Sequence, residues 1–167
     1  ANNKALIEAR INKGLRGQWY PIAKSVEVKN SRPYAAKVLG EKVVLWRDES
    51  GHLKCLEDVC PHRGAPLSFG KIHKGNISCR YHGVVVDGTG VIAQIPAMPK
   101  CALEGRNAVK SYETQEAADC VFIYIPSTEH PDAPPLVLPK EFGDDDWTGF
   151  LCTGLWGTNY RYALDNL

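Results

Sequence analysis

The chain has 167 residues, enough to bury the core of one ordinary domain and to add part of a second unit. Its formal net charge of +1 lacks the strong basic excess of general nucleic-acid binders, so we expect no nucleic-acid partner. No apolar run approaches the roughly 20 residues that span a bilayer, and the N-terminal residues lack the apolar core of a secretory signal. We therefore expect a soluble, cytoplasmic protein that does not bind a membrane.

The first third of the chain has the pattern of a short helix followed by β-strands. Apolar residues along one edge of 2–13 predict an amphipathic helix, which Gly14 and Gly17 bring to an end. Runs rich in β-branched and aromatic residues then predict strands, and we expect Trp19 and Trp46 to pack in the core. A polar turn containing glycine joins the last two strands. The expected strands in this part are 18–23, 34–39, 42–47 and 53–57.

Residues 58–99 have a different composition, dense in Gly, Pro, Cys and His. Short strands are predicted inside this stretch, and the sequence DGTG at 87–90 predicts a hairpin turn between two of them. Further strand patterns follow before residue 126. These patterns predict an antiparallel β-sandwich that holds a small loop-rich insert at one end. The expected strands from the insert onward are 76–79, 83–87, 91–95, 108–113 and 120–125.

The C-terminal part begins with a connector rich in proline. Five prolines between Pro126 and Pro139 predict an extended segment, and the acidic run that follows is interpreted as a solvated turn. After it, 148–156 predicts a strand and 159–167 predicts the opening of a helix without a C-cap. We expect this tail to begin a further domain of a longer polypeptide.

Several isolated cysteines and aromatic residues are interpreted as ordinary packing residues. Four of the six cysteines lie singly among apolar residues, where free cysteine usually serves as a small core side chain. Aromatic residues near the C-terminus are likewise expected to pack in a core, and packing against the further domain is the alternative. These residues are Cys55, Cys101, Cys120 and Cys152, and Trp156, Tyr160 and Tyr162.

The remaining two cysteines each lie beside a histidine. Cys60 and His62 are separated by one residue, Cys79 and His82 by two, and a glycine follows each pair closely. Two thiolates and two imidazoles suit a tetrahedral zinc site or an iron–sulfur cluster. The first pair is too close for easy chelation of one ion, whereas alternate residues of an extended loop point to opposite sides. This spacing favours a [2Fe–2S] cluster with Cys60 and Cys79 on one iron and His62 and His82 on the other. A zinc-stabilised binding module is the alternative.

The sequences CPHRGAPLSFG and CRYHG closely resemble the Rieske motif of ring-hydroxylating non-haem iron oxygenases, in their terminal oxygenase (alpha) component. The stretches RGQWYPIAKS, LEDVCPHRG, IPAMP, AVKSYE and NYRYALDNL are also similar to that family, so the resemblance runs from Gly17 onward. It implies a mainly β fold: a Rieske-type antiparallel β-sandwich with a small cluster-binding subdomain, a short N-terminal helix, and the start of an α+β catalytic domain. The corresponding segments are an arm at 1–17, the Rieske domain at 18–125 with its insert at 58–99, a connector at 126–146, and the beginning of the catalytic domain at 147–167.

The resemblance also implies an activity. In this family a ferredoxin or reductase donates an electron to the cluster, which passes it to a mononuclear Fe(II) in the catalytic domain for O₂-dependent hydroxylation of an aromatic ring. Neighbouring alpha subunits assemble as a trimer (α3 or α3β3), and His82 would face the neighbour's iron through a bridging carboxylate. This chain cannot build the second iron site, because His130 is its one histidine after His82. We therefore assign no catalytic residue within it.

Two details bear on the subtype. Ala65 and Tyr81 occupy the places of the extra cysteines of respiratory Rieske proteins, which disfavours that high-potential group. Val84 stands where many relatives have tryptophan, which leaves the subfamily open. A free-standing Rieske ferredoxin, which only carries electrons, is the alternative function. Such carriers are shorter and lack both the N-terminal arm and the C-terminal tail.

Basic residues are concentrated near the cluster motif. They are either an electropositive rim that attracts an acidic electron donor or ordinary solvated loop charges. His73 among them has no cysteine partner and is not assigned as a ligand, and His52 in its turn is expected to face solvent. The basic residues are Lys71, His73, Lys74 and Arg80.

Overall fold

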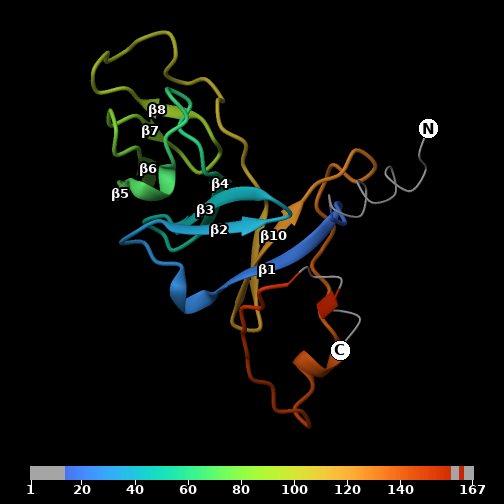
Figure 1. The fold of residues 1–167 in the computed structure, drawn as a ribbon. Coiled ribbons are helices and arrows are strands. Elements are labelled where there is room, and N and C mark those ends of the chain that lie inside the picture. Colours follow the sequence, from blue (N-terminus) through green and yellow to red (C-terminus); the bar gives the residue numbers. More distant parts are fainter. Residues whose placement is uncertain (1–13, 159–161, 164–167) are drawn as a thin grey trace, which may run out of the picture. The chain divides into compact units, whose positions relative to one another are not determined.

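The computed structural model describes residues 14–158 and 162–163, so the helix predicted at 2–13 lies outside the described residues. The chain divides into two compact units, Ala1–Leu136 and Val137–Leu167. The regular secondary structure in the described part of the first unit consists almost entirely of antiparallel β-strands, coloured from blue to orange in Figure 1. No helix among these residues is both long and apolar enough to cross a membrane. The predicted mainly β fold is confirmed.

The first sheet joins the two ends of this unit. Strand β1 (Gln18–Lys24) pairs with β10 (Cys120–Ile125), and β10 pairs in turn with β9 (Thr114–Ala117). The register of β1 shifts between Pro21 and Ala23, as expected where a proline cannot donate to the ladder. The strands predicted at 18–23 and 120–125 are therefore confirmed.

The second sheet is the middle layer of the unit. It contains β2 (Tyr34–Val38), β3 (Glu41–Arg47) and β4 (Leu53–Glu57) in that order. Successive residues of β3 point to opposite faces, and both faces are apolar. Val43 and Leu45 belong to the core shared with the first sheet, whereas Val44 and Trp46 belong to the core of the insert. The insert therefore packs directly on the sandwich.

The third sheet lies in the insert. Its strands are β5 (Lys71–His73), β6 (Asn76–Ser78), β7 (Val85–Val86) and β8 (Ile92–Gln94), paired in chain order. One face of this sheet contributes apolar residues, including the fully buried Ile77, to the core that contains Trp46. The indole N–H of Trp46 also donates to the Gly75 carbonyl over 2.8 Å, at the turn between β5 and β6. Packing and this buried hydrogen bond fix the insert on β3.

One strand prediction in this unit is wrong, and two strands were not predicted. The segment 108–113 forms no strand, its pairing with β4 is limited to the isolated bridge of Ser111 with Leu56, and the ladder with β10 is made by β9. The turn Ala118–Asp119, with positive φ at both residues, sets that register. The two strands that were not predicted are β9 and the short strand β5, which carries polar residues at both ends. The hairpin turn at 87–90 is confirmed, with the Asp87 carboxylate accepting the Thr89 and Val91 N–H groups.

Some predicted core residues are not buried. Trp46 is fully buried, but Trp19 is half-buried, with its ring 5.5 Å from that of Tyr124 and its N–H donating to Pro134. Cys55 and Cys120 are buried as expected. The prediction was wrong for the half-buried Cys101, in an irregular loop, and for the exposed Cys152.

The second unit also differs from expectation. The described part of Val137–Leu167 contains no strand at 148–156, because no partner strand lies beside it there, and Leu155 is fully exposed. Its regular structure consists of the 3₁₀ turn η3 (Lys140–Gly143) and the helical residues 162–163. The acidic run is solvated, as predicted. Core packing was wrong for Trp156 and Tyr162, which are 55% and 67% exposed, and Tyr160 lies outside the described residues.

Candidate metal centre

The first candidate ligand pair lies on a tight loop between β4 and η2 (Leu67–Phe69). The Cys60 N–H donates to the Ala65 carbonyl over 2.8 Å, and the Gly64 N–H donates to the Cys60 carbonyl over 2.9 Å. Gly64 has a φ of +70°, which side-chain-bearing residues rarely adopt. The glycine therefore lets the loop close and return beside its own start.

The second candidate pair lies on a loop between β6 and β7 that closes in the same way. The Cys79 N–H donates to the Val84 carbonyl over 2.8 Å, and the Gly83 N–H donates to the Cys79 carbonyl over 3.0 Å. Gly83 has a φ of +72°. Both loops thus place a glycine four residues after the cysteine and share one hydrogen-bond pattern, although the histidine is two residues after Cys60 and three after Cys79.

The two loops bring all four candidate side chains into one place. Cys60 and Cys79 are each only 3% exposed, whereas His62 and His82 are exposed. The Nδ1 atoms of the two histidines are 3.1 Å apart, and their rings meet edge to face with centroids separated by 4.6 Å. The structure therefore places sulfur donors at the buried end of the site and nitrogen donors at the solvent end.

The cysteine end has opposing electrostatic influences. Burial raises the pKa of the Cys60 thiol, and the neighbouring Cys79 raises it further, whereas the backbone N–H groups of His62 and Arg63 lower it. The Tyr81 N–H points to the Cys79 sulfur over 3.5 Å. Two buried thiolates side by side are unfavourable without positive charge between them, so this end of the site suits a metal ion.

The donors form two pairs of unlike chemistry. Among the described residues, no group of three or more His, Cys, Asp or Glu side chains is placed to hold a single ion. Each iron of a [2Fe–2S] cluster needs only two protein donors, because two bridging sulfides complete its coordination. One buried thiol pair and one exposed imidazole pair therefore fit such a cluster.

Two supporting contacts were not found by sequence reasoning. The Asp58 carboxylate accepts the Ser68 N–H over 2.7 Å and the Ser68 hydroxyl over 2.6 Å, which ties the start of the first loop to the turn after it. The Tyr81 ring lies against the His82 ring, with centroids 4.0 Å apart, and is 60% exposed. A sequence pattern gives little signal for either contact, because both depend on how the loops fold back.

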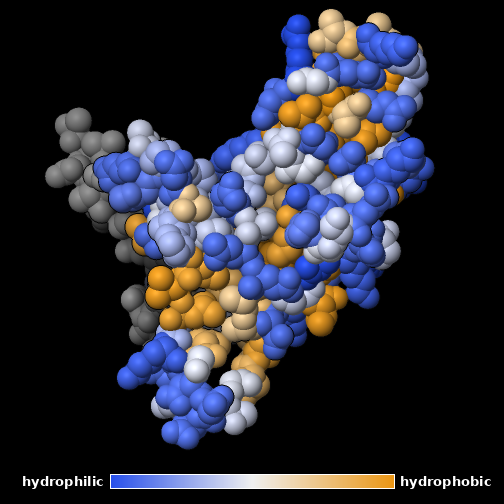
Figure 2. Space-filling view, turned by 180° about the vertical axis from the view of Figure 1, so that it is seen from behind, coloured by the Kyte–Doolittle hydropathy of each residue, from blue (hydrophilic) through white to orange (hydrophobic). Residues whose placement is uncertain are grey.

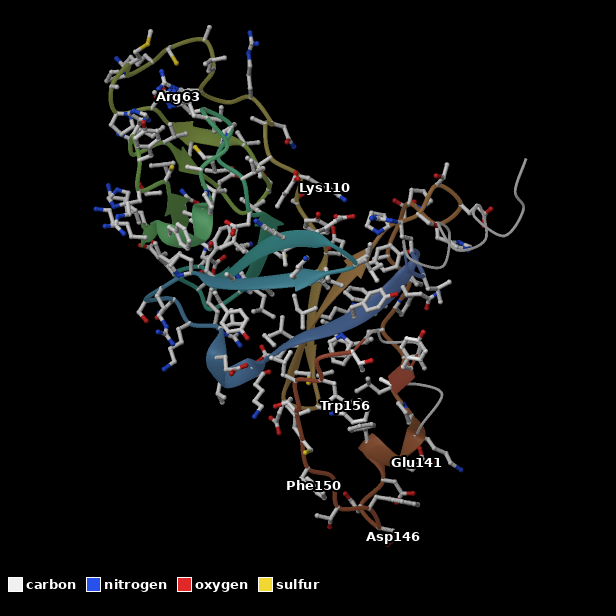
Figure 3. The ribbon with its side chains drawn as sticks, in the orientation of Figure 1. Arg63, Lys110, Glu141, Asp146, Phe150 and Trp156 are labelled. Carbon is white, nitrogen blue, oxygen red and sulfur yellow. The ribbon has the colours of Figure 1, made fainter. Side chains whose placement is uncertain are left out.

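The basic residues near the motif are only partly grouped. Lys71, His73 and Arg80 line a pocket of about 650 Å³ beside Cys79, whereas Lys74 is exposed but does not line it. Arg63 lies at the end of the insert away from the middle sheet (Figure 3). The predicted exposure of His52 is confirmed, with 75% of its side chain accessible.

Comparison with known proteins adds an independent observation. A family model described as the Rieske [2Fe-2S] domain matches residues 18–113. The chain is 38% identical to the terminal oxygenase component of carbazole 1,9a-dioxygenase from Metapseudomonas resinovorans, over 92% of this chain and 40% of that protein. It is 32% identical to the vanillate O-demethylase oxygenase subunit from a Pseudomonas strain, over 91% of this chain and 42% of that protein.

The fold is similar to solved structures as well. A structure of the reduced complex between oxygenase and ferredoxin in carbazole 1,9a-dioxygenase superposes with a TM-score of 0.71 at 37% identity, covering 87% of this chain and 40% of that chain. The chain thus spans less than half the length of these relatives. Together with the two matching loops and their paired donors, the family match shows that this chain belongs to the Rieske [2Fe–2S] domain family, among relatives that are terminal oxygenase components.

Proposed function

We propose that this chain is the Rieske portion of an aromatic-ring-hydroxylating oxygenase. In this proposal Cys60 and Cys79 hold one iron of the [2Fe–2S] cluster, and His62 and His82 hold the other. The observation that carries it is the pairing of two buried thiols with two exposed imidazoles whose Nδ1 atoms are 3.1 Å apart. A ferredoxin or reductase would donate the electron, and a mononuclear non-haem Fe(II) in a separate catalytic domain would receive it for O₂-dependent ring hydroxylation.

The bound cluster supplies one-electron chemistry at a potential higher than that of all-cysteine clusters, because two neutral imidazoles replace two thiolates. The cysteine pair and the histidine pair of this chain lie in different environments. The cysteine pair is held out of water in the core of the insert, while the histidine pair remains at the surface. An exposed histidine end would let a partner approach the cluster closely, and the Tyr81 ring would limit the orientations open to His82.

The length of the match favours the oxygenase over a free-standing Rieske ferredoxin. The identity to the carbazole dioxygenase component extends over 159 residues, well past the Rieske domain at 18–113. We place the N-terminal arm at 1–17, the Rieske domain at 18–125 and the connector at 126–146. Residues 147–167 would then begin the catalytic domain.

Exposed apolar side chains in the second unit support that assignment. Phe150 and Leu155 are 89% and 101% exposed, and Trp147 is 64% exposed. The space-filling view shows that apolar residues, coloured orange, reach the surface on the face that it presents (Figure 2). Exposing large apolar side chains to water is energetically unfavourable. We therefore propose that these residues pack against the remainder of the catalytic domain.

Partners follow from the same proposal. The related oxygenase of carbazole 1,9a-dioxygenase has been solved in complex with ferredoxin. We propose a ferredoxin or reductase donor for this protein, attracted by the basic residues of the insert. We further propose assembly of neighbouring alpha subunits as a trimer, α3 or α3β3, with an aromatic substrate bound in the catalytic domain.

Ligand substitution tests the proposal. Cys60→Ser and His82→Ala should each abolish the cluster, with loss of its visible absorption and its electron paramagnetic resonance signal. His52→Ala is the control, because His52 is exposed and distant in sequence from both loops. Normal iron and sulfide content in either ligand variant would contradict the assignment. Sequencing the gene beyond the codon for Leu167 separates the two functions, since an oxygenase requires two histidines and a carboxylate at triad spacing there.

A further inference from the structure

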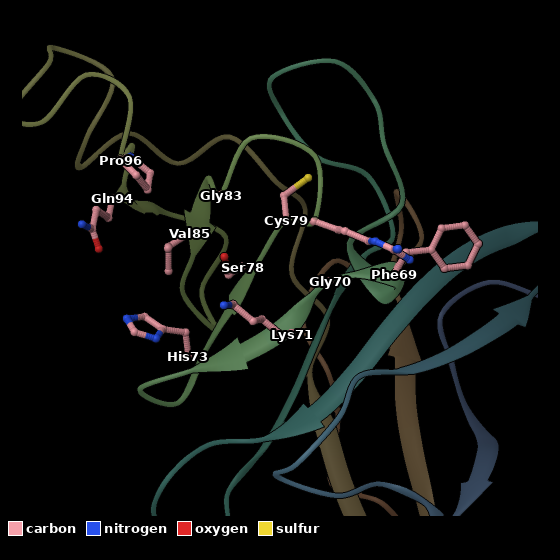
Figure 4. A pocket seen from close by; sticks show the side chains of 11 residues that line it. Phe69, Gly70, Lys71, His73, Ser78, Cys79, Gly83, Val85, Gln94 and Pro96 are labelled. Atoms are coloured by element: carbon pink, nitrogen blue, oxygen red, sulfur yellow. The ribbon is translucent and has the colours of Figure 1, made fainter.

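A pocket of about 650 Å³ lies on the outer face of the insert sheet, next to the second cluster loop (Figure 4). Its floor is a row of cross-strand partners: Lys71 pairs with Ser78, Ser78 with Val85, and Val85 with Gln94. Directly opposed residues in antiparallel strands point to the same face, so the row crosses all four strands on one side. The opposite face is buried in the core of the insert. The pocket is therefore separate from that core.

The pocket is positively charged. Lys71, His73 and Arg80 line it, and no aspartate or glutamate is among the described residues that do so. Lysine and arginine are permanently charged at neutral pH. Without a carboxylate from the protein to neutralise them, these side chains favour an anion in the pocket.

The Ser78 hydroxyl supports the same conclusion. Ser78 lines the pocket, and its side chain makes no hydrogen bond with any residue that the structure describes, while its oxygen remains accessible to solvent. The hydroxyl can therefore donate to an acceptor oxygen in the pocket, next to Lys71, its partner on the neighbouring strand.

The lining also includes apolar side chains beside the polar Gln94. Val85 lies on the floor, and Phe69 and Pro96 stand at the margin. A ligand with a hydrocarbon part gains from contact with such surfaces, whereas inorganic phosphate does not. We propose that this pocket binds a small organic carboxylate, with its oxygens at Lys71 and Ser78 and its hydrocarbon part against Val85 and Pro96.

Binding would act on the cluster, and this step rests on the function proposed above. The pocket borders Cys79, one of the candidate ligands. An added negative charge there disfavours the arrival of an electron, so a bound carboxylate lowers the reduction potential. By reciprocity, reduction weakens carboxylate binding by the same factor. A tenfold difference in affinity between the two redox states corresponds to a shift of about 59 mV for a one-electron couple.

The test uses cluster-loaded protein titrated with acetate, butyrate or inorganic phosphate. Calorimetry measures binding, and voltammetry measures the potential in the same buffers. We expect saturable binding at millimolar concentration or below, tighter for butyrate than for acetate or phosphate. Lys71→Met and Ser78→Ala should each weaken butyrate binding about tenfold. Lys74→Met is the matched control, because it removes the same charge from a residue outside the pocket, and it should change affinity less than about twofold.

Each alternative outcome has a defined meaning. Absence of saturable binding, equal weakening by Lys71→Met and Lys74→Met, or tighter binding of phosphate than of butyrate would overturn the carboxylate site. Binding without a fall in potential would overturn its coupling to the cluster. If the protein instead contained no [2Fe–2S] cluster, the proposed function would fail, while butyrate binding to the folded chain would still decide whether the pocket exists.

Discussion

Glu41 lies where three separate segments meet. Its carboxylate accepts hydrogen bonds from Arg16, before β1, and from Lys110 and Tyr112, in the segment that leads out of the insert. Lys110 also lies 4.5 Å from the centre of the Tyr112 ring. Glu41→Gln removes the charge from this group of contacts while keeping the size of the side chain, so it tests how much the ionised carboxylate stabilises the fold.

The expected size of the effect follows from the pKa of Glu41. Burial alone would raise that pKa, but hydrogen bonds from Tyr112, Arg16 and Lys110 lower it from 4.5 to about 2. A shift of this size corresponds to about 3 kcal/mol of stabilisation. Since 23% of the side chain remains accessible and is screened by water, we expect about 2 kcal/mol.

The pH dependence gives the prediction its sign. A carboxyl group whose pKa is lower in the folded state than in the unfolded state stabilises the fold fully at a pH above the pKa of the unfolded state. This contribution is lost as the pH falls toward the pKa of the folded state. Glu41→Gln should therefore reduce the free energy of unfolding by about 2 kcal/mol near pH 7 and by less than half as much near pH 3.

Urea denaturation of both proteins at the two pH values measures this difference. Glu49→Gln is the control, because Glu49 is exposed and should change stability by less than about 0.5 kcal/mol. An equal loss at both pH values would refute the electrostatic explanation, since a purely steric effect does not follow the ionisation of Glu41. A Glu41→Gln variant as stable as the parent near pH 7 would refute the role of the carboxylate altogether.

Two backbone and packing predictions can be checked by the same denaturation assay. Gly90→Ala should destabilise the fold by more than about 2 kcal/mol, because an added Cβ would lie 1.9 Å from the Val109 carbonyl oxygen at a φ of +89°. Gly51→Ala is the control and should cost about 1 kcal/mol, because Gly51 has a similar φ but no atom within 4 Å of an added Cβ. Equal losses of stability in the two variants would argue against the close approach at Gly90. Trp46→Phe should cost about 1–3 kcal/mol, because the buried Gly75 carbonyl loses its donor, and an unchanged midpoint would show that this bond does not hold the insert.

The strands of the sandwich could be predicted where local pattern and long-range pairing agree. The run KVVLWR forms β3 as expected, because a strand covered on both faces is apolar at nearly every position. The pattern failed at 108–113, where Val109 and Tyr112 are buried but the backbone lacks a neighbouring ladder. It also failed at 148–156, where the described residues of the second unit provide no partner strand. Burial and strand pairing are separate requirements, and a residue pattern reports only the first.

The chemistry of the candidate metal centre was largely determined by sequence. Two thiols and two imidazoles, each pair within a loop of a few residues and followed by a glycine, restrict the site by short-range geometry alone. The tertiary structure decided what each pair faces: the core of the insert covers Cys60 and Cys79, while His62 and His82 remain exposed.

The set of residues that lines the proposed carboxylate pocket depends entirely on the tertiary structure. Lys71, Ser78, Val85 and Gln94 are spread over 24 residues of sequence, and no local spacing relates them. They share one face only because the strands β5 to β8 pair in a single register, and a slip by one residue would turn each side chain to the opposite face. The metal-ligand residues of a short loop can thus be predicted from the sequence. A surface made by several strands cannot, because it depends on the register in which the strands pair.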